Sequence, residues 1–143
     1  MKNINVNFRY KCIEEIMRLN NGPALIYMAR RSNLNLDDFV PGTQKSYMQM
    51  AIEYGANGVI SSLLREGDAT KKAINAIPHL LGEEKKTLIF YNDEKAQSKK
   101  MMQLFAIASA LIETGAELKH SLSKVKIKTP IVKYLQSSAL QMS

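Results

Sequence analysis

Two short apolar segments separated by a glycine-containing turn are the feature that most constrains this fold. Residues 46–69 read S-Y-M-Q-M-A-I-E-Y-G-A-N-G-V-I-S-S-L-L-R-E-G-D-A. Apolar residues recur at three- and four-residue spacing on both sides of Gly55, which is typical of two short helices. Gly67 can adopt the left-handed conformation that ends a helix at little cost. One such pair cannot bury its apolar stripe alone, so we expect neighbouring pairs to stack on it.

The rest of the chain contains segments similar to this pair. Segments similar to its second helix end at a glycine or a small polar residue, namely Ser32, Gly67 and Gly115. Segments similar to its first helix begin at residues 11, 46, 87 and 129, at intervals of roughly 35 to 42 residues. Self-similarity at such a period indicates a repeat architecture. The alternative is a helical bundle whose segments resemble one another by chance.

The periodicity predicts an all-α protein, and the length of 143 residues favours one domain. Pro78 is expected to end or kink the helix in which it lies. The apolar run at 87–91 is too short to be assigned to helix or strand, and Gly115 is expected to cap the longest helix. A loop is expected at 34–45. The expected helices cover residues 10–19, 23–31, 46–54, 57–66, 68–81, 94–114 and 129–140.

These features resemble the ankyrin repeat, a unit of ~33 residues in which a turn precedes two antiparallel helices. In the best copy, S-Y-M-Q-M-A at 46–51 takes the place of the family's Thr-Pro-Leu-His opening, and G-D-A at 67–69 takes the place of its Gly-Ala-Asp ending. The last copy opens with T-P-I at 129–131. The resemblance implies stacked antiparallel helix pairs, an ankyrin-like solenoid with insertions, in a single domain of residues 1–143. The repeats are expected at about 10–43, 44–82 and 85–125, with a partial one at 127–143.

The copies depart from the family pattern in several places. The first has S-N at 32–33 in place of Gly-Ala, as an atypical end cap would. The third has Asn92 where a small alanine packs, extra residues near 94–101, and an insertion before it at 70–81. The fourth has a first helix and no second one. We therefore expect the chain to be a fragment, or a partner helix to complete its last repeat.

The chain is basic, with 20 Lys and Arg against 13 Asp and Glu and a net charge of +7. Such a balance fits contact with nucleic acid, anionic lipid or an acidic protein, and it also fits solubility alone. The lysines are spread along the chain except at 119–133, where five gather without an acidic residue between them. This cluster supports the alternative of a basic helical module that binds nucleic acid. The dense patch with base-reading side chains that duplex binding usually requires is lacking.

No targeting signal, membrane span or catalytic motif is recognisable. The first residues, M-K-N-I-N-V-N-F-R, contain no h-region of a signal peptide, and no apolar run approaches the ~20 residues that cross a bilayer. Cys12 is the only cysteine, which excludes an internal disulfide and fits a reducing, cytoplasmic location. It is expected to be a small buried residue rather than a nucleophile. A small enzyme that uses His79 or His120 is the remaining alternative, and otherwise we expect no catalysis, cofactor or metal.

The resemblance to ankyrin repeats also implies a function. Ankyrin arrays bind other proteins through their turn tips and the exposed side of their first helices, without catalysis. The lysine-bearing turns suggest an acidic partner. Divergent ankyrin-like proteins of this size occur among effectors and host-range factors of intracellular microbes and viruses. The chain is therefore expected to be a protein–protein interaction module or adaptor. One version of this expectation is a microbial or viral effector that is delivered into a host cell and acts on a host protein.

The binding positions of the family can be carried onto this chain. Phe39, on the first loop, is a further candidate as an exposed aromatic anchor, although it could equally pack over the core. Tyr54 is the first residue to test, because aromatic residues are enriched at interface hot spots. The carried-over positions are Gly42, Thr43, Lys45, Glu53, Tyr54, Glu84, Lys86, Glu94, Lys126 and Lys128.

Overall fold

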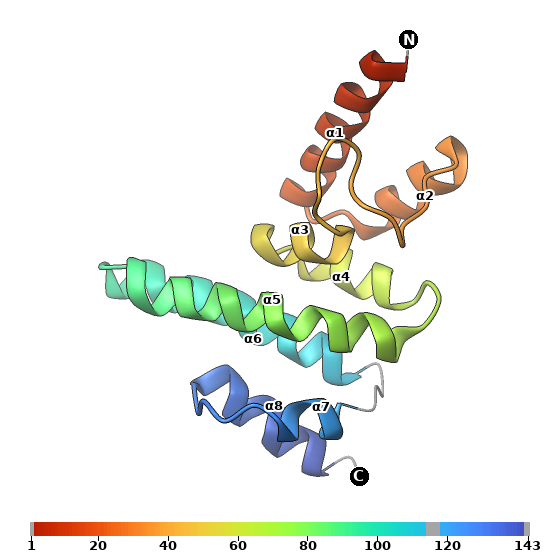
Figure 1. Ribbon diagram of the computed structural model, residues 1–143. Helices are drawn as coiled ribbons and strands as arrows, with labels where there is room; N and C mark the ends of the chain where they lie inside the picture. Colours follow the sequence, from red (N-terminus) through yellow and green to blue (C-terminus); the bar gives the residue numbers. More distant parts are fainter. Residues whose placement is uncertain (1, 114–117, 142–143) are drawn as a thin grey trace.

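The computed structural model describes residues 2–113 and 118–141, and within these ranges it contains eight helices and no strand. The prediction of an all-α protein is therefore confirmed for the described residues. Gly115, the expected cap of the longest helix, lies outside them. The helices, labelled in Figure 1, are α1 (Lys2–Arg18), α2 (Gly22–Ser32), α3 (Tyr47–Tyr54), α4 (Asn57–Leu64), α5 (Ala69–Phe90), α6 (Glu94–Glu113), α7 (Lys119–Ser123) and α8 (Pro130–Gln141).

The central pair predicted at 46–69 forms as α3 and α4. Ser46 caps α3, because its hydroxyl accepts a hydrogen bond from the backbone N–H of Gln49 at 3.0 Å. Gly55 ends α3 at a φ of +67°, a left-handed conformation that glycine adopts without strain. Gly67, after α4, has a φ of +84°. Gly55 therefore acts as the sequence predicts, whereas Gly67 is left-handed but lies beyond the end of α4, whose C-cap is Arg65.

The first turn of α4 is capped by a residue from another pair. Asn20, in the turn between α1 and α2, accepts hydrogen bonds from the backbone N–H groups of Gly58 at 2.7 Å and Val59 at 3.2 Å. Its amide donates to the side chain of Asn57 at 2.9 Å. The unpaired donors at the start of a helix need such acceptors. Asn20 thus joins the first helix pair to the second.

Helix α5 corrects the prediction for residues 68–92. Asp68 caps it, accepting from the backbone N–H of Lys71 at 3.1 Å, but the helix does not end at Pro78 and continues to Phe90. Pro78 lies on the exposed side, where water can bind the carbonyl that loses its amide partner. The helix expected at 68–81 is therefore present, but it continues into the run at 87–91, so residues 70–81 are its first half and not an insertion before a new helix. The apolar run at 87–91 closes this helix and does not open a new one.

The helix pairs are stacked along the molecule. α1 packs on α3 and α3 packs on α5, whereas α2 packs on α4 and α4 packs on α6. α8 packs against α5 and α6, and α7 packs against α8. Figure 1 shows this order from the N-terminal to the C-terminal helices. One cluster of buried apolar side chains runs through the stack, including Leu25, Ile60, Leu80, Ile107 and Leu135.

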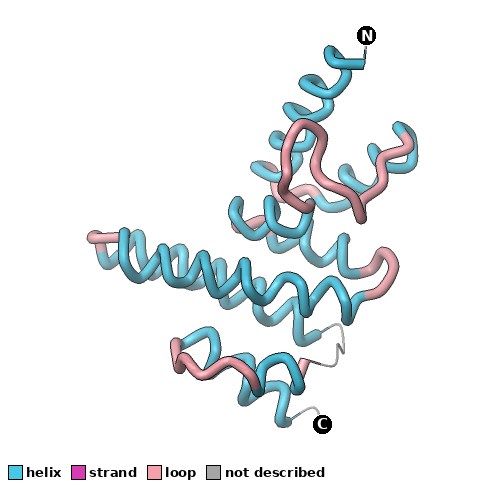
Figure 2. Tube along the Cα trace, in the orientation of Figure 1, coloured by secondary structure: helices cyan, strands magenta, loops and turns pink. Residues whose placement is uncertain are grey.

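Two parts of the chain extend away from this core. The loop at 33–46 runs back along α1, so that its Gly42 borders a shallow hollow with Val6 and Tyr10 (Figure 2). The connected ends of α5 and α6 project beyond α3 and α8 in the same view. The reason is length, since α5 has 22 residues and α3 has eight.

The last helix is tied to α5 by a buried carboxylate. Glu84 is fully buried and accepts hydrogen bonds from the hydroxyl of Thr129 at 2.5 Å and from the backbone N–H of Ile131 at 2.9 Å. A carboxylate is favourable at a helix N-terminus, where donors are unpaired. The expectation that Glu84 lies on a binding surface is wrong, because it caps α8 from inside the stack.

Candidate functional site

The loop at 33–46 is held by its own hydrogen bonds. The backbone N–H of Val40 donates to the carbonyl of Lys45 at 2.8 Å, and Phe39 and Ser46 form an isolated β-bridge. Val40 is fully buried, whereas the next side chain, Phe39, is 57% exposed. The alternation follows from the extended backbone, in which successive side chains point to opposite faces. Phe39 is therefore an aromatic side chain presented to solvent at a fixed position.

Thr43, another predicted site residue, stabilises this loop. Its hydroxyl donates to the carbonyl of Val40 at 2.8 Å and accepts from the backbone N–H of Lys45 at 3.1 Å. The side chain is half-buried. Its hydrogen-bonding groups are thus used within the turn.

Lys45 and Glu53 are brought together by the fold. The ammonium of Lys45 lies 2.7 Å from a carboxylate oxygen of Glu53, and this hydrogen bond raises the pKa of Lys45. The amide of Gln49 donates to the other carboxylate oxygen at 3.3 Å. The pair lies on the outer side of α3, opposite to fully buried Ala51. Its two charges largely neutralise each other.

Tyr54 joins α3 to α1. Its hydroxyl donates to a carboxylate oxygen of Glu14 at 2.8 Å, and its ring is half-buried. Burial and this hydrogen bond raise the pKa of Tyr54 to about 12. The sequence places Tyr54 on the binding side of α3, but its hydroxyl is already engaged inside the protein.

The remaining predicted residues lie away from this loop. Lys86, near the end of α5, pairs with Glu83 at 3.4 Å. Lys126 and Lys128 precede α8, where Lys128 donates to the side-chain carbonyl of Gln136 at 2.7 Å. The predicted site residues therefore form two groups. One lies around the loop and α3, and the other lies near the C-terminal end of α5 and just before α8.

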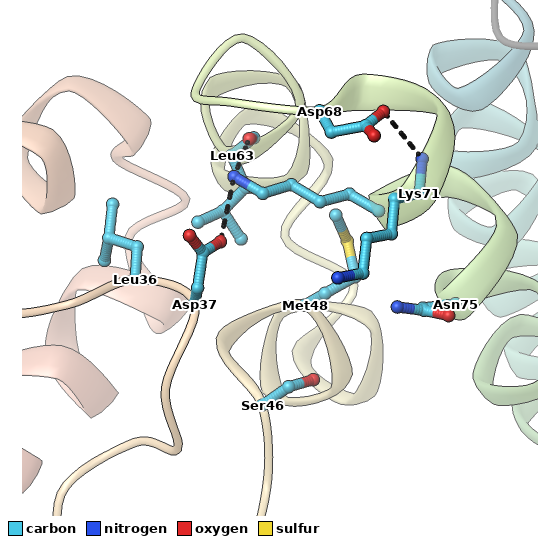
Figure 3. A pocket seen from close by; sticks show the side chains of 9 residues that line it. Leu36, Asp37, Ser46, Met48, Leu63, Asp68, Lys71 and Asn75 are labelled. Carbon is cyan, nitrogen blue, oxygen red and sulfur yellow. Dashed lines mark hydrogen bonds and ion pairs between the residues drawn. The ribbon is translucent and has the colours of Figure 1, made fainter.

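A pocket lies between the loop, α3 and the start of α5 (Figure 3). Its volume is about 300 Å³. Leu36, Met48 and Leu63 supply apolar walls, and exposed Lys71 and Asn75 lie on the side of α5. The other lining residues are Asp37, Ser46, Asp68 and Lys72.

Lys72 closes one side of this pocket and is not free to bind. Its ammonium donates to the carbonyl of Leu63 at 3.0 Å and to that of Glu66, so it caps the end of α4. The carboxylate of Asp37 lies 3.7 Å away. Lys71, one position earlier, is exposed. The two lysines therefore have different roles, one structural and one available to a ligand.

Sequence reasoning missed Lys71 and Asn75 because residues 70–81, although expected to be helical, were treated as an insertion between two repeats and not as part of a first helix. The signal was present in the buried positions Ala73, Ile77 and Leu80, whose spacing is that of a helix face. Lys71 and Asn75 are one turn apart on the opposite, exposed face.

The possible chemistry of the described residues is limited. Among them, no group of three or more His, Cys, Asp and Glu side chains is arranged to hold a metal ion. Cys12 is half-buried rather than buried as expected. No helix in the described ranges is long and apolar enough to cross a membrane.

The chain matches no protein-family model, and no similar chain is found among the curated proteins or the solved structures.

Proposed function

We propose that this chain is a protein-interaction module of the ankyrin kind, which binds a segment of a partner protein across the loop at 33–46 and the first turns of α3 and α5. The observation that carries the proposal is the pocket between these three elements. Binding pockets are typically apolar with a few converging polar groups. This pocket has apolar walls at Leu36, Met48 and Leu63, and its other lining residues are polar or charged. Exposed Phe39 lies on the same loop.

The sequence in which the helices contact one another supports the ankyrin-like part of the proposal. First helices contact first helices, from α1 through α3 to α5, and second helices contact second helices, from α2 through α4 to α6. The left-handed glycines Gly55 and Gly67 lie where such a repeat turns and ends. In a stack of this kind, the loop side of the first helices is left open for a partner.

The lining suggests the chemistry of the partner segment. An apolar side chain of the partner would contact Leu36, Met48 and Leu63. A carboxylate next to it would reach the ammonium of Lys71, which forms no ion pair within the described part of the chain. Asn75 can hydrogen-bond to the backbone of an extended segment. The partner segment is therefore expected to carry an apolar residue beside an acidic one.

The test is affinity capture from cell extract with matched variants. Wild type is compared with Lys71→Glu in the pocket and with Lys11→Glu, which changes another exposed lysine, on α1. Both substitutions change the net charge by the same amount. A protein retained by wild type and Lys11→Glu but lost with Lys71→Glu supports the proposal. Equal capture by all three variants contradicts it.

A second candidate function rests on the lysines at 119–133. All five are exposed, and none of them forms an ion pair with a described residue. Phosphate binding by these lysines would make affinity for DNA or RNA fall steeply with salt. Replacing Lys126 by Gln should then reduce the salt slope by about one. If the lysine variants bind nucleic acid as wild type does, this candidate fails.

A further inference from the structure

The last turn of α5 exposes consecutive large apolar side chains. Ile89 is 56% exposed and Phe90 is 72% exposed, and they are flanked by partly exposed Leu88 and Tyr91. Only Thr87 in this turn is buried; its carbonyl accepts from the side chain of Gln97 on α6 at 3.4 Å. Contiguous exposed apolar side chains of this kind mark an interaction site.

The arrangement of these side chains restricts what can cover them. Successive residues of a helix point about 100° apart, so positions 88, 89 and 90 face different directions around the end of α5. A flat surface laid along one side of the helix would leave some of them in water. A binding partner that surrounds the projecting end of α5 (Figure 1) would cover the side chains at all three positions.

A basic segment precedes α8 and reaches α5 one turn before the last turn of that helix. Glu84, one turn before Leu88, binds Thr129 and Ile131, so the segment at 124–128 ends next to this part of α5. This segment reads K-V-K-I-K, and its Ile127 is 70% exposed. Apolar and basic side chains therefore alternate in it.

The charges around this end are mainly positive. Lys85 on α5 and Lys124 and Lys126 in the basic segment are exposed. Two of the nearby carboxylates are engaged within the protein, because Glu83 pairs with Lys86 and Lys100 and Glu84 caps α8. Asp93, which accepts from the backbone of α6, and Glu94 are exposed.

We propose that the last turn of α5 and the segment at 124–128 form a docking surface for an anionic lipid bilayer. The apolar side chains enter the headgroup region, and the lysines contact lipid phosphates and carboxylates. Peripheral membrane binding combines these two terms, buried apolar area and attraction to anionic lipid. Nucleic acid would use the lysines alone and leave Ile89, Phe90 and Ile127 uncovered. This surface is separate from the pocket at Lys71.

The first test is co-sedimentation with vesicles of phosphatidylcholine alone and of equimolar phosphatidylcholine and phosphatidylserine. Wild type is expected to bind the anionic vesicles only. Lys124→Gln with Lys126→Gln should weaken binding by about fivefold for each lysine. Phe90→Ser should weaken it by about tenfold. Ile127→Ser is a second apolar variant, used if Phe90→Ser does not fold.

Matched controls lie at the other end of the stack. Lys11→Gln with Arg31→Gln removes the same charge from exposed positions, and Phe8→Ser removes a phenylalanine that is 67% exposed. These controls should bind as wild type does. Circular dichroism confirms that each variant is folded.

The second test uses a fluorescent reporter, because the chain contains no tryptophan. Emission from Phe90→Trp should shift to shorter wavelength with anionic vesicles, whereas emission from Phe8→Trp should not. The proposal is overturned if wild type does not bind anionic vesicles, or if the control and test variants lose binding to the same extent. It is also overturned if Lys124 and Lys126 are needed only for DNA or RNA, or if Phe90 is needed only for a protein partner.

Discussion

The α3–α4 and α5–α6 pairs differ in how much of their length the stack covers. In α3 and α4, five of the eight residues in each helix are buried. In α5, six of 22 residues are buried, and in α6, four of 20. The shorter pair lies between neighbours on both sides. The longer pair extends past α3 and α8, as Figure 1 shows.

Because of this difference, substitutions in the shorter pair should change stability, whereas substitutions at the projecting end of the longer pair should change only the surface. Residues of α3 and α4 are mostly committed to the core, so a substitution there acts mainly on folding. The projecting part of α5 has few neighbours to lose, so its side chains can be changed with little cost to the fold. We therefore expect the two pairs to respond differently to the same kind of substitution.

The largest contrast is expected from a charge introduced into each pair. Leu63→Asp in α4 places a carboxylate at a position that is 2% exposed and should cost roughly 4 kcal/mol or more of the free energy of unfolding. Ile89→Asp at the projecting end should change it by less than about 0.5 kcal/mol. Thermal melts followed by circular dichroism measure both. A cooperative melt of Leu63→Asp at the wild-type temperature contradicts the stacked core.

The next effect concerns the connection between the longer pair and α8. Glu84→Ala removes the acceptor for Thr129 and for the backbone N–H of Ile131. Leaving a buried donor unpaired costs about 1–3 kcal/mol. Urea denaturation should show this loss, and hydrogen exchange should show it first in α8. Unchanged protection of α8 would mean that packing alone holds this helix.

Two glycines provide a contrast of opposite sign. A Cβ at Gly22 would lie 2.5 Å from the backbone carbonyl oxygen of Gly58, whereas a Cβ at Gly82 on α5 would meet nothing within 4 Å. Gly22→Ala should therefore destabilise by about 1–3 kcal/mol. Gly82→Ala should stabilise by up to about 1 kcal/mol through helix propensity. Chemical denaturation of the two variants decides the comparison, and a shift of the same sign in both contradicts it.

The smallest effect is expected where α3 meets α1. Tyr54→Phe removes the hydrogen bond to Glu14 and should cost about 0.5–1.5 kcal/mol at neutral pH. The pKa of Tyr54 is raised from 10.0 to about 12 in the folded protein, so the unfolded chain loses this proton first as pH rises. This contribution to stability is present below pH 10 and is lost between about pH 10 and 12.

The measurement is the free energy of unfolding against pH for both proteins. Over that window wild type should lose more stability than Tyr54→Phe, and the curves should converge at the alkaline end. Parallel curves would show that the hydroxyl of Tyr54 is not held between α1 and α3.

Prediction from the sequence worked where local signals agree with the tertiary structure. The helix pair around Gly55 was predicted because a cap, a left-handed glycine and apolar spacing lie within a few residues. At α5 the helix expected at 68–81 is present, but it does not end at Pro78, because this proline lies on the exposed face. Lys71 and Asn75 were missed because residues 70–81 were treated as an insertion between repeats. For Phe39 the sequence left exposure and packing over the core equally open, and the tertiary structure leaves its side chain 57% exposed.

The sequence by itself determined that the chain is helical and that residues 46–69 form two short helices joined at Gly55, because caps and periodicity act over one or two turns of backbone. Only the tertiary structure decided which polar groups are used internally. Tyr54 binds Glu14, Asn20 caps α4, and Glu84 caps α8, each across a large separation in sequence. No local pattern encodes these contacts, because they depend on how one helix pair is placed on the next. The same placement leaves the end of α5 projecting beyond α3 and α8, with its apolar side chains in contact with water.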